Sequence, residues 1–146
     1  MIKKIALVTG GFDPLHSGHI KYFNSAKKLA DYLVVGLNSD EWLIRKKGNY
    51  FLPCKERLII LNALSVIDET IIFNDNDDTA VEAIYCLKKQ YEDSKIIFCN
   101  GGDRSIKNIP EYKVFSQDEQ IIFKFGVGGV EKLNSSSKIL EKWKQK

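Results

Sequence analysis

Short apolar, β-branched runs alternate with helical patterns along the whole chain, and this alternation is the feature that most restricts the fold. The runs have the length and residue types of buried strands, and they lie at 5–9, 32–37, 70–73, 95–99 and 121–125. Strands that alternate with helices build a parallel sheet with helices on both faces. We therefore predict an α/β protein with a doubly wound, five-stranded parallel sheet of the Rossmann type, in a single domain over residues 1–146.

The first apolar run ends in a glycine turn, and a helical pattern begins directly after it. Gly10 and Gly11 form the turn, and His16 and His19, the only two histidines of the chain, lie where the helix is expected to start. Backbone N–H groups at a helix start together carry about half a positive charge. Glycine lets the backbone approach a ligand closely. We therefore expect a phosphate-binding site at this turn.

A second glycine turn is expected near the same site. The fourth run passes into Gly101-Gly102-Asp103-Arg104, and the carboxyl ends of parallel strands meet at a topological switch point. The serine run Ser135-Ser136-Ser137 opens the last helical pattern. An N-cap needs only one serine, whereas three hydroxyl groups at a helix start can also bind phosphate. Both interpretations of the serine run are open at this point.

Composition and charge exclude several other kinds of protein. A net charge of +3 is too small to indicate a nucleic-acid partner, and no run approaches the about 20 apolar residues that span a bilayer. Cys54, Cys86 and Cys99 are widely spaced and form no C-x-x-C pair, so a zinc site is not expected. Sparse, unpaired cysteines indicate reduced thiols. We expect a cytoplasmic protein with no nucleic-acid or membrane partner and no metal ligands of its own.

The residues around the first turn also resemble a known family. Residues 10–16 read G-x-F-D-x-x-H, and residues 16–19 read H-x-G-H. This combination resembles the cytidylyltransferase-like nucleotidyltransferases, which include glycerol-3-phosphate cytidylyltransferase and the heptose-phosphate adenylyltransferases. The resemblance implies an enzyme that joins CTP or ATP to a small phosphomonoester, such as a sugar or polyol phosphate, and releases pyrophosphate. It further implies that Mg²⁺ accompanies the triphosphate, with no protein ligand assigned, and that the protein forms a homodimer to which Trp42 or Phe51 contributes.

The resemblance also implies roles for individual residues. The catalytic residues would be His16, His19 and Lys46, the last in a basic loop over 45–50. The nucleotide would contact Gly11, Phe12, Asp13, Gly102, Asp103, Ser135, Ser136 and Ser137. The acceptor phosphate would contact Arg57 and Arg104. Two readings of Asp13 stay open, because its carboxylate can either orient the turn or contact the substrate.

The sequence departs from the glycerol-phosphate pattern in one place. That pattern has an arginine five residues before the first serine, and this chain has Val130 there. Arg104 or Lys132 would have to substitute, which weakens the assignment of glycerol 3-phosphate. Two alternative functions are a non-catalytic, nucleotide-binding regulatory module of the same fold and a fragment related to class I aminoacyl-tRNA ligases. The intact histidines and Lys46 oppose the first alternative, and the short, weakly basic chain opposes the second.

Overall fold

The protein was analysed as a computed structural model, which describes residues 2–102, 104–129 and 135–145. The five strands are β1 (Lys4–Gly10), β2 (Tyr32–Leu37), β3 (Glu69–Ile72), β4 (Lys95–Cys99) and β5 (Ile121–Lys124). The helices are α1 (Ser17–Lys27), α2 (Asp40–Lys47), α3 (Cys54–Asn62), α4 (Val81–Gln90), the 3-10 turn η1 (Ile106–Asn108), α5 (Pro110–Phe115) and α6 (Ser136–Lys144).

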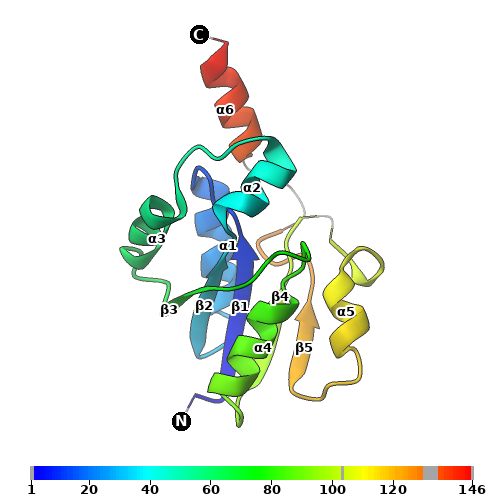
Figure 1. The fold of residues 1–146 in the computed structure, drawn as a ribbon. Coiled ribbons are helices and arrows are strands. Elements are labelled where there is room, and N and C mark those ends of the chain that lie inside the picture. Colours follow the sequence, from blue (N-terminus) through cyan, green and yellow to red (C-terminus); the bar gives the residue numbers. More distant parts are fainter. Residues whose placement is uncertain (1, 103, 130–134, 146) are drawn as a thin grey trace.

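All the strands form one parallel sheet in the order β3-β2-β1-β4-β5 (Figure 1). The sequence-based prediction of a doubly wound, five-stranded parallel sheet is therefore confirmed. The chain moves outward from β1 to β3 on one side and returns to β4 on the other side of β1. The switch point consequently lies between β1 and β4, where ligands of such sheets bind.

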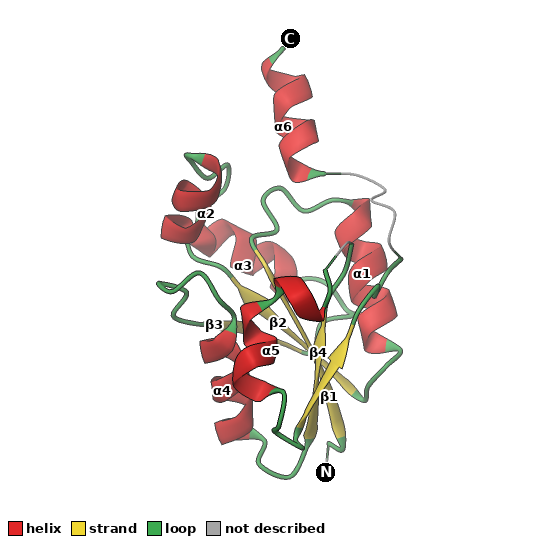
Figure 2. Cartoon of the chain, turned by 90° about the vertical axis from the view of Figure 1, so that its right-hand side faces the viewer, coloured by secondary structure: helices red, strands yellow, loops and turns green. Residues whose placement is uncertain are grey.

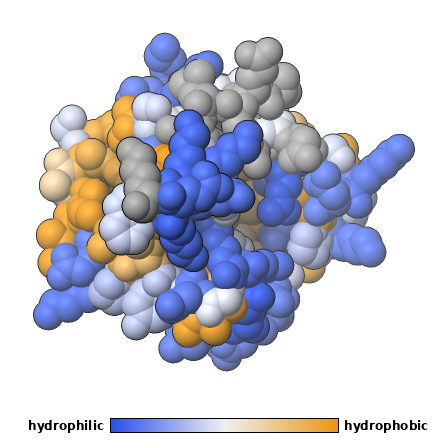
Figure 3. Space-filling model, turned by 90° about the horizontal axis from the view of Figure 1, so that it is seen from above, coloured by the Kyte–Doolittle hydropathy of each residue, from blue (hydrophilic) through white to orange (hydrophobic). Residues whose placement is uncertain are grey.

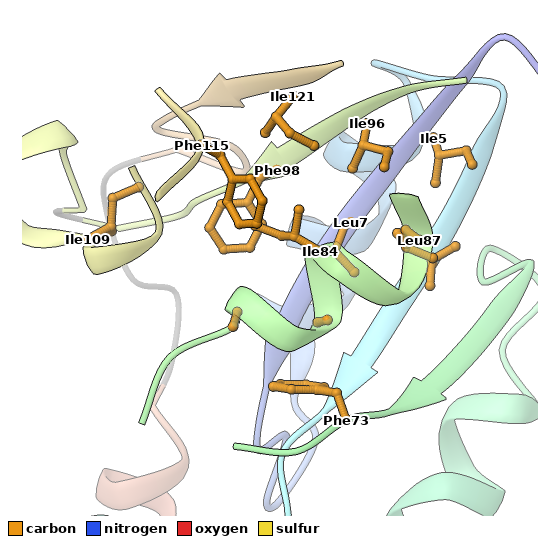
Figure 4. Close-up of a cluster of buried hydrophobic side chains, with 13 residues drawn as sticks. Ile5, Leu7, Phe73, Ile84, Leu87, Ile96, Phe98, Ile109, Phe115 and Ile121 are labelled. Atoms are coloured by element: carbon orange, nitrogen blue, oxygen red, sulfur yellow. The ribbon is translucent and has the colours of Figure 1, made fainter. Parts of the chain in front are cut away.

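Two apolar cores cover the two faces of the sheet. Alternate residues along β1 point to opposite sides, so Leu7 joins one core and Val8 joins the other. Figure 4 shows the first core, in which Ile84 and Leu87 of α4 and Phe115 from the end of α5 face the strands. The second core packs α1 and α3 against the opposite face. Figure 2 shows α4 and α5 on one side of the sheet and α1 on the other.

The prediction of a basic loop over 45–50 is wrong for its first half, because residues 45–47 form the last turn of α2. Ser39 caps the start of this helix by accepting a hydrogen bond from the Trp42 N–H at 3.1 Å. Acidic residues occupy the first turn and basic residues the last, which complements the helix dipole. Gly48 ends the helix in the left-handed conformation, with φ of 86°. Only the segment after Gly48 is a loop.

Helix α5 was not predicted from the sequence. It has only six residues, too few for a clear helical period, and it begins with Pro110 at its first position. Proline followed by an acidic residue is a common helix start, so the signal was present in Pro110-Glu111. This omission matters because α5 brings Glu111 to the carboxyl end of the sheet.

Candidate active site

A cavity of about 450 Å³ opens at the carboxyl ends of β1 and β4. Its lining includes the first glycine turn, from Thr9 to Phe12, and the second turn at Asn100 and Gly101. His19 and Arg104 also line it, so the structure brings together two of the predicted basic residues. The expectation that the two glycine turns share one crevice agrees with this geometry.

His16 and His19 form a reciprocal cap at the start of α1. The Nδ1 atom of His16 accepts a hydrogen bond from the Gly18 N–H at 3.1 Å, and Nδ1 of His19 accepts one from the His16 N–H at 3.2 Å. The two rings are stacked, with their centroids 3.8 Å apart. Because Nδ1 is an acceptor in both neutral rings, the proton of each ring lies on Nε2. Each histidine can therefore donate one hydrogen bond from Nε2.

Both imidazole groups are held in the neutral state. Burial, assisted by the nearby charge of Lys47, lowers the pKa of His16. Burial, His16 and Lys47 together lower the pKa of His19 to about 3. At neutral pH the pair thus acts through oriented N–H dipoles and the helix start, not through two fixed positive charges.

The lowered histidine pKa predicts a dependence of stability on pH. Between pH 7 and 5 an unfolded histidine, with a pKa of about 6.5, binds protons that the folded His19 does not bind. The stability that the neutral His19 contributes is therefore fully present above about pH 6.5, and it is lost progressively as the pH falls toward 3. Urea unfolding at pH 7 and pH 5 should show a smaller loss in His19→Ala than in the wild type. An identical loss in both proteins would contradict the assignment.

The backbone of the first turn is strained and closely packed. Phe12 has φ of 50°, which a bulky residue rarely adopts, and its ring meets His19 edge-on at 5.1 Å. A Cβ atom on Gly11 would lie 2.8 Å from Cδ2 of Leu43, so only glycine fits there without movement. Among the described residues, Asp78 is the other non-glycine residue with positive φ, and it lines the cavity too. Strain of this kind concentrates at functional sites.

Asp13 orients a loop in this structure. Its side chain is buried, and its two carboxylate oxygens accept hydrogen bonds from the N–H groups of Phe51 and Leu52 at 2.6 and 2.7 Å. Asp13 does not line the cavity. Of the two readings left open by the sequence, the geometry supports the one in which the carboxylate orients the backbone.

Arg57 is not available to a substrate phosphate, because its side chain is fully buried. Its guanidinium donates to the carbonyl oxygens of Leu52, Gly11 and Asn38 at 2.8–2.9 Å and to the Asp40 carboxylate at 2.7 Å. In this structure the Arg57 guanidinium therefore binds the protein backbone and Asp40, where the resemblance implied a contact with the acceptor phosphate. Arg57 fastens the first glycine turn to the segments on either side of α2.

Lys46 and Lys47 lie at the exposed end of α2. The Lys46 ammonium is 5.9 Å from the centre of the Trp42 ring, and Trp42 lines the cavity. Lys47 acts on both histidines, since its charge contributes to the lowering of the pKa of each ring. Both lysines are thus near the site, and neither lines the cavity itself.

The second glycine turn is only partly described. Gly102 has φ of 61°, in the left-handed region that glycine tolerates, and the exposed Arg104 lines the cavity. Asp103, which was expected to contact the nucleotide, lies outside the described residues, as do Val130 and Lys132. The position of Arg104 on the cavity wall is compatible with a phosphate contact.

The serine run is tied to the first turn. The Ser135 hydroxyl caps α6 by accepting from the Lys138 N–H at 3.4 Å, and the Ser136 hydroxyl donates to the Pro14 carbonyl at 2.8 Å. Ser137 is exposed. In Figures 1 and 2, α6 extends away from the sheet beyond the carboxyl ends of the strands. The cap and the turn contact use two of the three hydroxyl groups in this structure.

The sequence analysis missed the wall of the cavity formed by Asp78, Thr79 and Glu111. Glu111 is 6% exposed, and its Oε2 atom accepts a hydrogen bond from the Ala80 N–H at 2.8 Å. Two signals for this wall were present in the sequence. One is the acidic segment over 74–78, before α4, and the other is the helix start at Pro110-Glu111. Neither shows by itself that two segments about 30 residues apart meet.

The described residues contain no group of three or more His, Cys, Asp or Glu side chains placed to hold a metal ion. They also contain no helix that is both long and apolar enough to cross a membrane.

The parallel sheet has a switch point beside a glycine turn and a helix N-terminus of the kind that binds phosphate. These features define a Rossmann-like α/β domain. A family model described as cytidylyltransferase-like matches residues 7–141, and the chain therefore belongs to this family. The resemblance seen in the histidine motif is thus confirmed for the family.

Several curated relatives carry the name bifunctional protein HldE. The protein from Campylobacter jejuni subsp. jejuni serotype O:2 is 38% identical over 146 residues, covering 99% of this chain and 28% of the relative. Its counterpart from Helicobacter pylori strain J99 is 34% identical, covering 98% of this chain and 28% of the relative. The protein from Pelobacter propionicus is 43% identical over 103 residues, covering 69% and 20%. The chain thus spans less than a third of the length of these relatives.

Solved structures share the fold. A lipopolysaccharide core biosynthesis protein from Thermoplasma volcanium is 26% identical, with a TM-score of 0.61, and the match covers 86% of this chain and 94% of that chain. A putative nicotinate-nucleotide adenylyltransferase from Vibrio parahaemolyticus has a TM-score of 0.68 over 98% of this chain and 88% of that chain. At 16% identity, this second match supports the fold alone.

Proposed function

We propose that this domain is a nucleotidyltransferase that joins CTP or ATP to a sugar or polyol phosphate and releases pyrophosphate. The observation that carries the proposal is the pair of neutral, stacked histidines at the start of α1, each with an Nε2–H donor, of which His19 lines the cavity. Membership of the cytidylyltransferase-like family and the relatives named HldE support it, and the family resemblance to heptose-phosphate adenylyltransferases favours ATP and a sugar phosphate.

In the proposed reaction, an oxygen of the acceptor phosphate attacks the α-phosphorus, and pyrophosphate leaves on the opposite side. A phosphate oxygen is already an anionic nucleophile at neutral pH, so the site needs no strong base. The protein must position two anions and stabilise the charge that develops between them. His16 and His19 would donate from Nε2 to the α-phosphate oxygens, and the N–H groups that begin α1 would face the same charge.

Other residues would bind the phosphates around this centre. Gly11 and Phe12 would lie along the nucleotide, with Gly102 and Asp103 near its base and ribose. Arg104 would hold a phosphate group from the cavity wall, since a guanidinium can bind phosphate with two hydrogen bonds. The serine run would bind the β- and γ-phosphates once its present contacts open. Mg²⁺ would accompany the triphosphate and neutralise its charge, held mainly by phosphate and water.

Lys46 is proposed to bridge the two phosphate groups as pyrophosphate departs. A group that acts mainly on the transition state lowers kcat more than it weakens ground-state binding. We expect Lys46→Ala to lower kcat by a larger factor than it raises the Kd for triphosphate, and Lys47→Ala to have a small effect. Single-turnover rates and calorimetry would compare the two variants. If Lys47→Ala is the impaired variant, the bridging cation is Lys47, whose charge already acts on both histidines.

The experiment that tests the function is a grid of the four nucleoside triphosphates against glycerol, ribitol, heptose and amino-alcohol phosphates. The measurement is pyrophosphate release. Release with one triphosphate and one sugar or polyol phosphate is the expected result. Triphosphate binding without release from any pair would instead favour the non-catalytic regulatory module.

We further propose that the single domain over 1–146 acts in the cytoplasm as a homodimer, without a nucleic-acid or membrane partner. The outer face of α3 supports dimer formation. Ile59 and Ile60 are 56% and 39% exposed, and the neighbouring Phe51 is 50% exposed. Seen from above, apolar residues gather on the side of the molecule where α3 lies (Figure 3). A helix that is apolar on both its inner and outer faces is usually buried on both.

A further inference from the structure

The cavity has two walls that come from opposite faces of the sheet. One wall carries His19 and Tyr22 of α1. The other carries Thr79, at the loop before α4, and Pro110 and Glu111 at the start of α5. Because α1 and the α4–α5 pair lie on different sides of the sheet (Figure 2), residues from both layers line the same cavity at the ends of β1 and β4.

The two walls differ in charge. The α1 wall combines the helix start with His19, and Arg104 is near it, because its charge partly offsets the burial that raises the pKa of Tyr22. The α4–α5 wall has the opposite character, with the carboxyl groups of Asp78 and Glu111 and the hydroxyl of Thr79. A triphosphate is stabilised at the first wall and repelled from the second.

We propose that the α4–α5 wall is the subsite for the uncharged, hydroxylated part of the acceptor, and that Glu111 determines acceptor specificity. This inference rests on the proposed function. Carboxylate and hydroxyl groups on a rigid wall are suited to sugar hydroxyls, which donate and accept hydrogen bonds. Glu111 is positioned for this role, because its Oε2 atom is fixed by the Ala80 N–H while the side chain stays on the cavity lining.

Asp78, the other carboxylate of this wall, is less available to the acceptor. Asp78 already pairs with the Arg45 guanidinium at 3.0 Å. The Trp42 ring, which also lines the cavity, already faces the Lys46 ammonium. Of the two carboxylates on this wall, Asp78 is therefore neutralised by a cation of the chain, and Glu111 is the one left to contact the acceptor. A second anionic group on the acceptor would be repelled by Glu111, whereas the hydroxyl groups of a neutral polyol can donate hydrogen bonds to it.

Glu111→Gln tests the inference, because a glutamine oxygen can still accept from the Ala80 N–H and so retain the start of α4. We expect the KM for heptose 1-phosphate to rise about tenfold, as a charge-assisted hydrogen bond is replaced by a neutral one. The Kd for the triphosphate, measured by calorimetry without acceptor, should change less than about twofold, because the triphosphate is expected at the α1 wall and not at Glu111.

Glu82→Gln is the matched control, since Glu82 is an exposed acid on the first turn of α4 and does not line the cavity. It should leave both constants unchanged. An unchanged KM in Glu111→Gln, whether or not the Kd for the triphosphate changes, would overturn the proposed subsite while the proposed function stands. A better KM for phosphoethanolamine than for heptose 1-phosphate would also overturn it. Absence of pyrophosphate release from the wild type with every pair would instead overturn the proposed function.

Discussion

Replacing His16 or His19 with alanine is expected to lower kcat by about 10²–10³-fold, the usual loss when one preorganised donor to a developing charge is removed. The two rings are fixed by each other and by the start of α1, so their Nε2–H groups need no reorientation during the reaction. Alanine removes the Nε2–H donor and one of the two side-chain caps of α1, while the backbone N–H groups that begin the helix remain. The Kd for triphosphate should change less than kcat, because the α-phosphate becomes most crowded in the transition state.

Single-turnover rates, calorimetry and circular dichroism would measure these effects separately. His16 is also the N-cap of α1, so its variant should lose about 1 kcal/mol of stability while it keeps the fold. Asn24→Ala, an exposed change on the same helix, serves as the control and should leave turnover unchanged. Near-normal turnover in both histidine variants would refute the proposed mechanism.

The second large effect is expected on stability. Arg57→Ala should lower the free energy of unfolding by about 3–5 kcal/mol, since it removes a fully buried guanidinium together with its ion pair to the partly buried Asp40 and its hydrogen bonds to three carbonyl oxygens. The variant would remove the guanidinium donor from the carbonyl oxygens of Gly11, Asn38 and Leu52, and the Asp40 carboxylate would keep only the Cys54 N–H of its two donors among the described residues. Buried polar groups that lose their partners cost more than the net value of the hydrogen bonds themselves.

Urea unfolding would measure this loss. Lys55→Ala is the matched control, because Lys55 lies on the same helix but is exposed, and it should stay within about 0.5 kcal/mol of the wild type. Arg57→Lys should recover only part of the loss, because one ammonium group cannot reproduce the planar fork of donors. Should Arg57→Ala keep its stability and instead raise the KM for the acceptor, the phosphate-binding role inferred from the family resemblance would be restored.

The sheet was predictable because its central strands are buried on both faces. Leu33, Val34 and Val35 of β2 are all fully buried, and such a strand appears in the sequence as a continuous apolar run. The end of α2 and the whole of α5 were not predictable in the same way. The last turn of α2 is entirely basic and exposed, and α5 is too short to show a period, so neither has a clear apolar pattern.

The site was predictable where neighbours in sequence are also neighbours in space. His16 and His19 are one helical turn apart, so their proximity followed from the spacing. The roles of Arg57 and Asp13 depend on their burial by segments that are distant in the sequence. Charged residues are normally expected to be exposed, so these two roles were not predicted. The contact between Glu111 and the start of α4 is set by packing across the sheet, which spacing along the chain does not show.

The two walls of the cavity have a consequence for the order of substrate addition. If the nucleotide occupies the α1 wall and the acceptor the α4–α5 wall, the two substrates contact different residues, and neither needs the other in order to bind. Both must be present together before the phosphate oxygen can reach the α-phosphorus. Kinetics with two varied substrates should therefore follow a random, sequential scheme with intersecting reciprocal plots. A compulsory order of addition would contradict this separation of the two substrates.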